Sequence, residues 1–533
     1  MKELVRPNTP GGSPLVRDYL AGSPATAGFF NGSPYLLRTF RAKLDEVTLR
    51  FDRAARQTAA AAVEPLSDRG KERLQRFVEQ GGAMVTTGQQ AGFLTGPLYT
   101  IHKAVSAIVL ARHLEERLGI LVLPVFWIAS EDHDWLEVNH ASLLDRKGRL
   151  RRFELPSSDP RPLPMSHRRL EGDLDSLCDD ILHTVGAARN NTDYVKEVLA
   201  AYRTPGTSVA DAFRGAFRTI FAGSDLLLTD AADPTVKGAS RRVLRAALED
   251  SPEHEAVLSR RSDELEAAGY RPQVNVLEGA TNVFFLTESG RFRVYRRGAD
   301  YALREERRRL NGEELLGTLE ADPGLFSPNV FLRPVVESAV FPTLAYVGGP
   351  GEIAYFAQVS ALFEAYGIRP PAVVPRFSGV IVEPAVERVL EELGLDLARL
   401  ATPKEALVEQ LAQAALPPAV REALDGIRQS VAGGFERLID EAIELDPTLA
   451  GPLGSIRNRE QLWTAVAERK ILRAIKRGDR IAFDRLDRVL DALRPEAAPQ
   501  ERVLNVLPYL GRYGGYFLRE LDRVVVESWR MPL

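Results

Sequence analysis

The stretch of chain that most constrains the fold runs from residue 83 to residue 129. Short apolar runs at 83–87 and 121–129 predict two buried strands, and the amphipathic pattern between them predicts a helix over 98–118. A strand, a helix and a second strand form a βαβ unit, in which the strands are parallel and the crossover is right-handed. Both faces of the second run are apolar, which is typical of the middle of a parallel sheet. We therefore expect an α/β protein built on an open parallel sheet.

The loop between the first strand and the helix is rich in glycine. Glycines let the backbone approach a ligand closely, and the helix N-terminus behind them offers free N–H groups and a positive dipole end. Because neither a P-loop nor G-x-G-x-x-G occurs here, we expect an anion or substrate site of another type. The alternative is a tight turn that only needs glycine. The candidate residues of this loop are Gly88, Gln89, Gln90, Gly96, Tyr99 and Lys103, whose ammonium is placed to reach a bound carboxylate or phosphate.

The second predicted strand ends in a dense group of ionisable residues, 130–134 (SEDHD). In open α/β sheets the ligand crevice lies at the carboxyl ends of the strands, and such a group is costly to bury without a purpose. Repulsion between the acids is expected to raise some carboxylate pKa values, which suits general acid–base catalysis by Asp132, His133 or Asp134. A metal site that adds His140 is a second hypothesis, and a solvated loop that caps the next helix is a third. We assign no metal.

Later strands are predicted at 225–229, 343–347 and 372–375, and two of them lead into further polar loops. The glycine loop after 343–347 ends at Glu352, which suits a ribose hydroxyl or an amino group, or else pairs with the dipole of the next helix. Arg376 follows 372–375 and suits a phosphate or carboxylate clamp. The same edge of the sheet would bring these loops to one crevice.

Composition excludes several classes of protein. The chain has 533 residues and a net charge of −4, so several domains are expected and general binding of nucleic acid is not. Its single cysteine, Cys178, excludes an internal disulfide and a cysteine-based zinc site and fits a reducing cytosol. The N-terminus has no apolar signal segment, and no run of about 18 apolar residues occurs. We expect a cytoplasmic protein that does not enter the membrane.

We divide the chain into three parts. Residues 1–382 are expected to form the α/β core, with insertions at about 141–220 and 271–336 and a hairpin near Ser289 in the second. Residues 383–500 show helical patterns, and between 424 and 445 an apolar residue recurs at every seventh position, which predicts an antiparallel coiled-coil hairpin that contributes to a dimer. Residues 501–533 are expected to pack back on the core. The seam residues of the coiled coil are Leu424, Val431, Leu438 and Leu445.

Several long motifs are spread along most of the chain. They are TGQQAGFLTGPLYTIHK, PVFWIASEDHDWLEVNH, FSPNVFLRPVVES, PTLAYVGGPGEIAYFAQ, VVPRFSG and, near the C-terminus, NVLPYLGRYG. Together they resemble the BshC family, the cysteine-adding ligases of bacillithiol biosynthesis. The resemblance implies a Rossmann-like core related to class I nucleotidyltransferases, connecting insertions, and a long antiparallel coiled coil that supports a homodimer.

The same resemblance implies an activity, the last step of that pathway. It would form an amide bond between the carboxylate of cysteine and the amine of glucosaminyl-malate. The turn at Gly96 resembles the place of the His-Ile-Gly-His motif of class I enzymes, but the chain lacks those histidines, a Lys-Met-Ser-Lys-Ser loop and the cysteine zinc ligands of some relatives. The sequence therefore does not choose between an acyl-adenylate and an acyl-phosphate.

Amide formation sets demands on the side chains. A carboxylate must be activated, for which we expect ATP or ADP as the bound nucleotide, a base must deprotonate the amine, and donors must stabilise the oxyanion. We assign the base to the 130–134 cluster, and the binding of negative charge to Lys103 and to N–H groups near Gly96. The residues expected to bind and orient substrate are Gly88, Gln89, Gln90, Gly96, Tyr99, Glu131, Gly348, Gly349, Glu352 and Arg376.

A second nucleotide contact is expected where the C-terminal segment meets the coiled coil. Tyr509 would stack on a base, Arg512 would bind phosphate, and Asn505 lies beside them in a turn that contains glycine. The alternative is that this segment only anchors the hairpin to the core.

Two other functions compete with the ligase. One is a class I nucleotidyltransferase or tRNA-charging enzyme, against which the acidic net charge and the missing motifs count. The other is a non-catalytic scaffold whose coiled coil is the functional part, against which the glycine loops and acids at several strand ends count.

Overall fold

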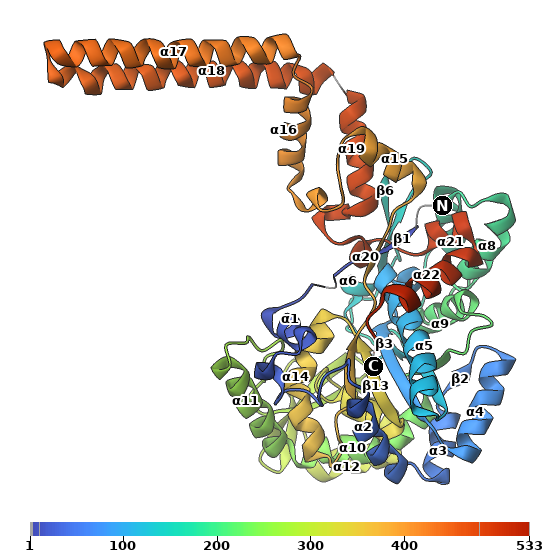
Figure 1. The fold of residues 1–533 in the computed structure, drawn as a ribbon. Coiled ribbons are helices and arrows are strands. Elements are labelled where there is room, and N and C mark those ends of the chain that lie inside the picture. Colours follow the sequence, from blue (N-terminus) through green and yellow to red (C-terminus); the bar gives the residue numbers. More distant parts are fainter. Residues whose placement is uncertain (1–3, 10, 479, 532–533) are drawn as a thin grey trace.

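The computed structural model describes residues 4–9, 11–478 and 480–531. Within that part of the chain, the centre is a six-stranded sheet in the order β14-β13-β3-β4-β7-β2 (Figure 1). Strands β14 to β7 are mutually parallel, and β2 at the edge runs antiparallel. The strands are β2 (Glu64–Pro65), β3 (Ala83–Gln90), β4 (Val122–Ala129), β7 (Leu227–Asp230), β13 (Thr343–Gly348) and β14 (Ala372–Pro375). All the apolar runs predicted as strands of the core are therefore confirmed.

The sheet is buried because its side chains alternate between two apolar faces. In β4, Leu123 and Trp127 pack into the core that helices α10, α13 and α14 share, whereas Phe126 and Ile128 face the side of α5. This alternation explains why the strand is apolar at nearly every position. The helices of these layers are α5 (Leu98–Leu118), α10 (Pro234–Glu249), α13 (Arg333–Val340) and α14 (Pro350–Ala365).

The N-terminal residues and the first insertion surround this core. Strand β1 (Val5–Pro7) pairs antiparallel with β15 (Gly379–Ile381), which ties the first residues to the end of the α/β unit. The helices that follow are α1 (Pro14–Ala21), α2 (Leu37–Arg50), α3 (Arg53–Ala61) and α4 (Asp68–Gln80). Between β4 and β7 lie α6 (Trp135–Val138), the hairpin β5 (His140–Leu144) and β6 (Leu150–Glu154), and helices α7 (Leu174–Val185), α8 (Thr192–Ala200) and α9 (Val209–Ile220).

The second insertion, between β7 and β13, begins after α11 (Ser251–Ala267) and carries an antiparallel sheet in the order β11-β10-β9-β8-β12. The predicted hairpin near Ser289 is confirmed, because that turn joins β8 to β9. This sheet brings β9 to the edge of the candidate site. Its elements are β8 (Ala280–Thr287), β9 (Gly290–Arg297), β10 (Asp300–Leu303), β11 (Arg308–Leu310), α12 (Gly312–Ala321) and β12 (Phe326–Pro328).

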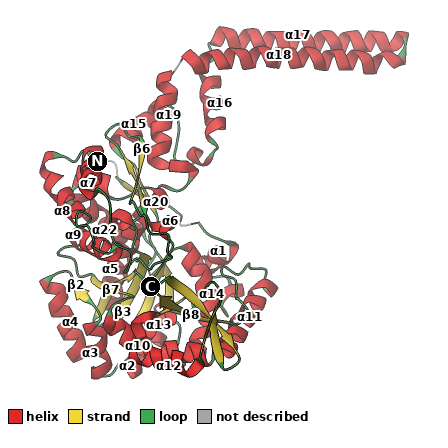
Figure 2. Cartoon of the chain, turned by 180° about the vertical axis from the view of Figure 1, so that it is seen from behind, coloured by secondary structure: helices red, strands yellow, loops and turns green. Residues whose placement is uncertain are grey.

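The helical C-terminal part projects from the α/β body as a long antiparallel pair, α17 and α18 (Figures 1 and 2). Proline residues at the start of α17, and Pro447 between the pair, fix where the two helices begin and reverse. The expected antiparallel hairpin is therefore present. Its helices are α15 (Pro384–Glu392), α16 (Lys404–Ala414), α17 (Pro418–Leu445), α18 (Ala450–Gly478) and α19 (Arg480–Leu493).

The predicted seam of this hairpin is wrong in its distal half. Leu424 is buried, but Leu438 is 50% exposed and Leu445 is 86% exposed in the single chain, while Ala442 takes the buried position. An α-helix drifts by about 20° per heptad relative to a strict seven-residue repeat, so the stripe leaves the partner helix after a few turns. The exposed leucines are therefore available to another surface.

The C-terminal segment returns to the α/β body through α20 (Gln500–Val503), α21 (Leu507–Tyr513) and α22 (Gly515–Ser528), and α22 packs on α5. The Leu98 N–H at the start of α5 donates to the Leu504 carbonyl at 2.8 Å, which joins the two segments. Among the described residues, no helix has both the length and the apolar character needed to cross a membrane.

Candidate active site

The predicted crevice is present at the carboxyl ends of β3, β4 and β13. It is a cavity of about 590 Å³ at the place where the strand order reverses, between β3 and β13, which is where open α/β sheets bind ligands. The predicted site residues that line it are Gly88, Gln89, Gln90, Tyr99, Lys103, Glu131, Asp132, His133, Gly349, Glu352 and Arg376. Gly96 lines a neighbouring hollow instead, and Gly348 contributes its carbonyl to the Arg376 N–H at 2.8 Å.

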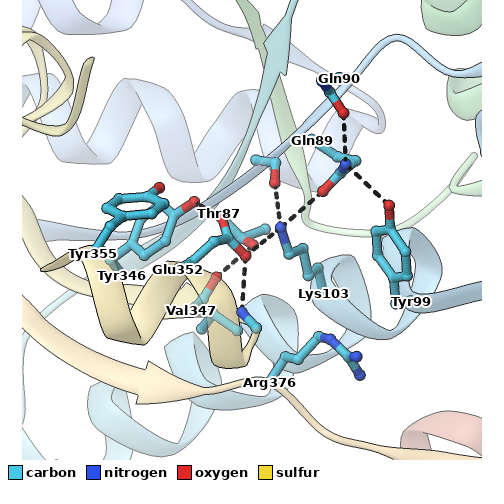
Figure 3. A network of polar contacts seen from close by, with 12 residues as sticks. Thr87, Gln89, Gln90, Tyr99, Lys103, Tyr346, Val347, Glu352, Tyr355 and Arg376 are labelled. Carbon is cyan, nitrogen blue, oxygen red and sulfur yellow. Dashed lines mark hydrogen bonds and ion pairs between the residues drawn. The ribbon is translucent and has the colours of Figure 1, made fainter. Parts of the chain in front are cut away.

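Lys103 lies at the centre of the polar network, where the glycine loop meets α14 (Figure 3). Its ammonium binds the Gly88 carbonyl at 2.8 Å, the Gln89 amide oxygen at 2.9 Å and the Glu352 carboxylate at 2.5 Å. An ammonium has three donors, and these contacts occupy all of them. In this structure Lys103 therefore joins two loops of the pocket, and its role in binding a substrate anion stays a prediction.

The Glu352 carboxylate accepts hydrogen bonds from two other groups besides the Lys103 ammonium. Its second contact is the Gly349 N–H at 2.8 Å, and the Tyr346 hydroxyl donates to its other oxygen at 2.5 Å. Burial opposes ionisation, but the Lys103 ammonium and these donors together hold the pKa of Glu352 below its usual value. Glu352 is thus the partner of the helix start, which was the alternative to a ribose contact.

Arg376 is also occupied by the protein itself. Its two outer nitrogens donate to the two oxygens of Glu501 at 2.9 and 2.7 Å, in a pair that is almost fully buried. Glu501 also binds the His102 ring at 3.0 Å and the Ser378 hydroxyl at 2.8 Å. The predicted clamp therefore holds a carboxylate of α20 and not a ligand, and it fixes the C-terminal segment beneath the pocket.

The glutamines of the loop are oriented by neighbours in the same pocket. The Gln89 amide donates to the Tyr99 hydroxyl at 3.3 Å (Figure 3). The Gln90 amide donates to Asp132 at 2.6 Å and to Glu137 at 2.9 Å. Burial and nearby carboxylates raise the pKa of Tyr99 to about 12, so its hydroxyl stays protonated. These side chains form a polar wall with fixed donor directions.

The residues of the 130–134 cluster have different partners and surroundings in the structure. Glu131 forms a buried ion pair with Lys237 of α10, while Asp132 and His133 face the cavity. Asp134 is exposed, does not line the cavity, and accepts the Glu137 N–H at 3.3 Å as the cap of α6. Its assignment as a candidate base is therefore wrong, because it has the capping role that was the alternative. Among the described residues, no cluster of three or more His, Cys, Asp or Glu side chains is arranged for a metal ion.

The second insertion contributes cavity residues that the sequence patterns did not reveal. Arg291 and Arg293 come from β9, and Arg333 begins α13, where it binds Glu337 at 2.6 Å and the Tyr355 hydroxyl at 3.0 Å. The signal available was the motif FSPNVFLRPVVES, which points to the region but not to its place in the pocket.

Cationic side chains outnumber carboxylates along the cavity wall, six to four. Two of the six, Arg333 and Arg376, are neutralised by Glu337 and Glu501, neither of which lines the cavity. The side chains of two of the cations, Arg293 on β9 and Arg502 at the end of α20, have no hydrogen bond or ion pair with any described residue. Unpaired guanidinium groups in a hollow are the natural partners of carboxylate or phosphate groups. The arrangement therefore suits a ligand with several negative charges.

The residues expected to form a second nucleotide contact are buried or bound to other parts of the protein. Tyr509 is 1% exposed and stacks on Phe517, so its ring cannot receive a base. The Asn505 amide donates to the carbonyls of Leu94 and Gly96 at 2.7 Å each, and Arg512 pairs with Glu383. The prediction is wrong for this conformation, and the segment does what the alternative states: it anchors the chain to the glycine loop.

Comparisons with known proteins agree with this architecture. Residues 1–377 match the family model described as "Bacillithiol biosynthesis BshC, N-terminal Rossmann-like domain", and residues 379–524 match the C-terminal coiled-coil domain of the same family. Three relatives carry the name "Putative cysteine ligase BshC". The protein from Koribacter versatilis is 32% identical over 94% of this chain and 93% of its own length.

The other two relatives also match this chain over nearly its whole length. The protein from Solibacter usitatus is 31% identical over 95% of this chain and 94% of its own, and that from Bacillus licheniformis is 29% identical over 95% of each. Both domains are matched in their order along the chain, and the residues that line the pocket lie in the Rossmann-like one, apart from Arg502. The chain therefore belongs to the BshC family of bacillithiol biosynthesis.

Proposed function

We propose that this protein is the ligase that joins the carboxylate of cysteine to the amine of glucosaminyl-malate, the last step of bacillithiol biosynthesis. The observation that carries the proposal is the cationic cavity at the reversal of strand order, with Arg293 and Arg502 unpaired. Malate carries two carboxylates and cysteine a third, and carboxylates are the groups that free guanidinium side chains bind. The names of the relatives support the same activity.

The reaction needs an activated carboxylate, and ATP supplies it when bound. The free guanidinium groups of Arg293 and Arg502 fit a polyphosphate as well as they fit malate, so the residues present suit ATP as a co-substrate. The N-terminus of α14, at Pro350 and Gly351, also lies on the cavity wall, where the positive end of the helix dipole favours an anion. Lys103 and Glu352 keep this wall in place.

Asp132 is the residue best placed to accept the proton of the attacking amine. It lines the cavity, and its carboxylate is held by the Gln90 amide at 2.6 Å and the His133 N–H at 2.7 Å. The oxygen that accepts from His133 also accepts the Asp134 N–H at 3.2 Å, so the oxygen that accepts from Gln90 is the one that keeps a lone pair for a proton. A general base of this kind contributes about 10²–10⁴-fold to a rate.

The test uses purified protein with cysteine, glucosaminyl-malate and ATP, and detects the thiol product by mass spectrometry. Asp132→Asn should lower turnover by about 10²–10⁴-fold. Asp134→Asn is the matched control, because that side chain lies outside the cavity and asparagine also caps a helix. Absence of product from the wild type would contradict the proposal, and equal turnover in both variants would move the base elsewhere. Parallel reactions without ATP, and with ADP, identify the nucleotide that is used.

We also propose a homodimer formed through the α17–α18 hairpin. Leu438 and Leu445 are exposed in the single chain, as is Trp463 on α18. Burying such side chains in a partner stabilises by about 1.5–3 kcal/mol each. Leu438→Asp with Leu445→Asp should therefore give a monomer by light scattering, whereas Leu49→Asp, at an equally exposed leucine of α2, should not. An unchanged dimer in the double variant, or a monomeric wild type, would contradict this interface.

The substrates place the proposed reaction in the cytoplasm, where free cysteine and ATP occur together. Its partners are then small molecules and a second copy of the chain, without nucleic acid. Cell fractionation with an antibody to the protein tests the location, and its recovery in the membrane or the extracellular fraction would contradict it.

A further inference from the structure

The ring of His133 has a partner that fixes its hydrogen-bonding direction. Its Nδ1 lies 3.1 Å from a terminal nitrogen of Arg291. A guanidinium group has only donors, so Nδ1 must be the acceptor. Arg291 is itself immobilised, because its Nε donates to the Ser327 hydroxyl at 2.7 Å and its other terminal nitrogen to the Pro328 carbonyl at 3.0 Å. Its guanidinium also lies 3.8 Å from the centre of the Phe284 ring, which packs edge-on against His133.

We infer that Arg291 is a positioning residue that holds His133 as the neutral tautomer with its proton on Nε2, so that His133 serves the cavity as a hydrogen-bond donor and not as a base. The role of the donated proton rests on the proposed function: it would stabilise the oxygen of the reacting carbonyl as negative charge develops there. The tautomer itself follows from the contact with Arg291 alone.

Four charged groups face the His133 ring, two from its own loop and two from β9. Asp132 and Asp134 favour the imidazolium, whereas Arg291 and Arg293 oppose it. Burial and the arginines prevail, and they hold the pKa of His133 below its usual value. A proton on Nδ1 would also point at the guanidinium and break the existing hydrogen bond. The ring therefore stays neutral near neutral pH, with its only proton on Nε2.

This assignment changes the roles within the 130–134 cluster. The sequence left the base open between Asp132, His133 and Asp134, and the structure removes Asp134 from the cavity. If the lone pair of His133 is committed to Arg291, Asp132 is the remaining acceptor of the three. The two cavity residues would then have complementary roles, with Asp132 accepting a proton and His133 donating a hydrogen bond.

His102 supplies an internal reference for this claim. Its Nδ1 contacts the Glu501 carboxylate at 3.0 Å, and a carboxylate can only accept, so the neutral His102 ring carries its proton on Nδ1. The two histidines should therefore show opposite tautomers in one sample. The tautomer of a histidine is set by the partner of the other nitrogen, which differs here between a guanidinium and a carboxylate.

The first experiment is NMR of the full chain labelled with ¹³C in its histidine rings, whose carbon shifts distinguish the tautomers. The His133 signals are identified by their loss in His133→Gln. At about pH 7.5, well above the usual histidine pKa of about 6.5, we expect Nε2–H for His133 and Nδ1–H for His102. Arg291→Met should release His133 into a mixture of tautomers and raise its pKa, and Arg291→Lys, which keeps a cationic donor, should restore the Nε2–H form. An Nδ1–H or imidazolium His133 in the wild type overturns the inference without bearing on the ligase activity.

The second experiment compares two amide replacements for His133. The glutamine amide nitrogen occupies roughly the place of Nε2 and the asparagine amide nitrogen that of Nδ1, and neither amide is a base. Loss of one oxyanion donor costs about 10²–10³-fold in turnover. Because only His133→Gln keeps a donor at the place of Nε2, its turnover should be at least about tenfold higher than that of His133→Asn. Equal losses in two variants with unchanged melting curves would overturn the donor role. If the wild type forms no product at all, the proposed reaction fails, while the NMR result still decides the tautomer.

Discussion

Replacing either partner of the Lys103–Glu352 pair should strongly lower the free energy of unfolding of the α/β unit. Replacing both should lower it by less than the sum of the two single losses. The Lys103 side chain is 4% exposed, so Glu352→Gln leaves a buried ammonium without its counter-ion. Lys103→Met likewise leaves Glu352 ionised beside an apolar chain. Loss of one partner of a buried pair costs about 3–5 kcal/mol. The double variant should fall about 1–3 kcal/mol short of the sum of the single variants, because residues in contact are coupled by this amount.

The measurement is urea unfolding, followed by tryptophan fluorescence, to which the buried Trp127 contributes, and by circular dichroism, for the wild type, the two single variants and the double variant. The control pair is Lys404–Asp487, in which both side chains are about half exposed. Its double-variant cycle should give a coupling of about 0–1 kcal/mol, as exposed pairs do. Additive costs at Lys103 and Glu352, or the same coupling in both cycles, would refute the claim that this buried pair joins the loops of the pocket.

Three further changes have defined outcomes. Gly88→Ala should lower the melting temperature and the substrate affinity, because an added Cβ would lie 2.7 Å from the Trp127 carbonyl; wild-type values would contradict that close contact. Burial lowers the pKa of His102, so its contribution to stability is complete above about pH 6.5 and declines as the pH falls; a melting temperature that rises on acidification would contradict this sign. Burial raises the pKa of Cys178 to about 11, so a thiol reagent should modify it only after unfolding, and rapid reaction of the native protein would disagree.

Local patterns were sufficient for the sheet and for the location of the crevice. The apolar runs at 83–87 and 121–129 are buried on both faces, a condition that leaves a direct trace in the sequence. Polar residues directly after such runs lie at one edge of a parallel sheet, so the approach of the 130–134 cluster to the glycine loop followed from topology. The antiparallel hairpin likewise followed from its helical periodicity and its proline breaks.

The roles of individual cavity residues did not follow, because they depend on partners that are distant in the sequence. Lys103 was predicted to bind a substrate anion, but in the structure it forms an ion pair with Glu352, which is 249 positions away in the sequence. Arg376 was assigned to a ligand, but the buried Glu501 is its partner. Arg291 reaches His133 through a hairpin of the second insertion, and nothing in the spacing of that insertion shows which edge it will pack against. Charge pairing between distant segments is thus the information that local patterns lack.

We propose that this protein completes bacillithiol by adding cysteine through the cavity that Asp132 lines. The decisive measurement is mass spectrometry of small thiols in the host, with and without the gene. We expect that the deletion strain accumulates glucosaminyl-malate and lacks its cysteinyl product, and that the wild-type gene and Asp134→Asn restore the product whereas Asp132→Asn does not. An unchanged thiol pool in the deletion strain, or full restoration by Asp132→Asn, would show that the protein or its cavity has another function.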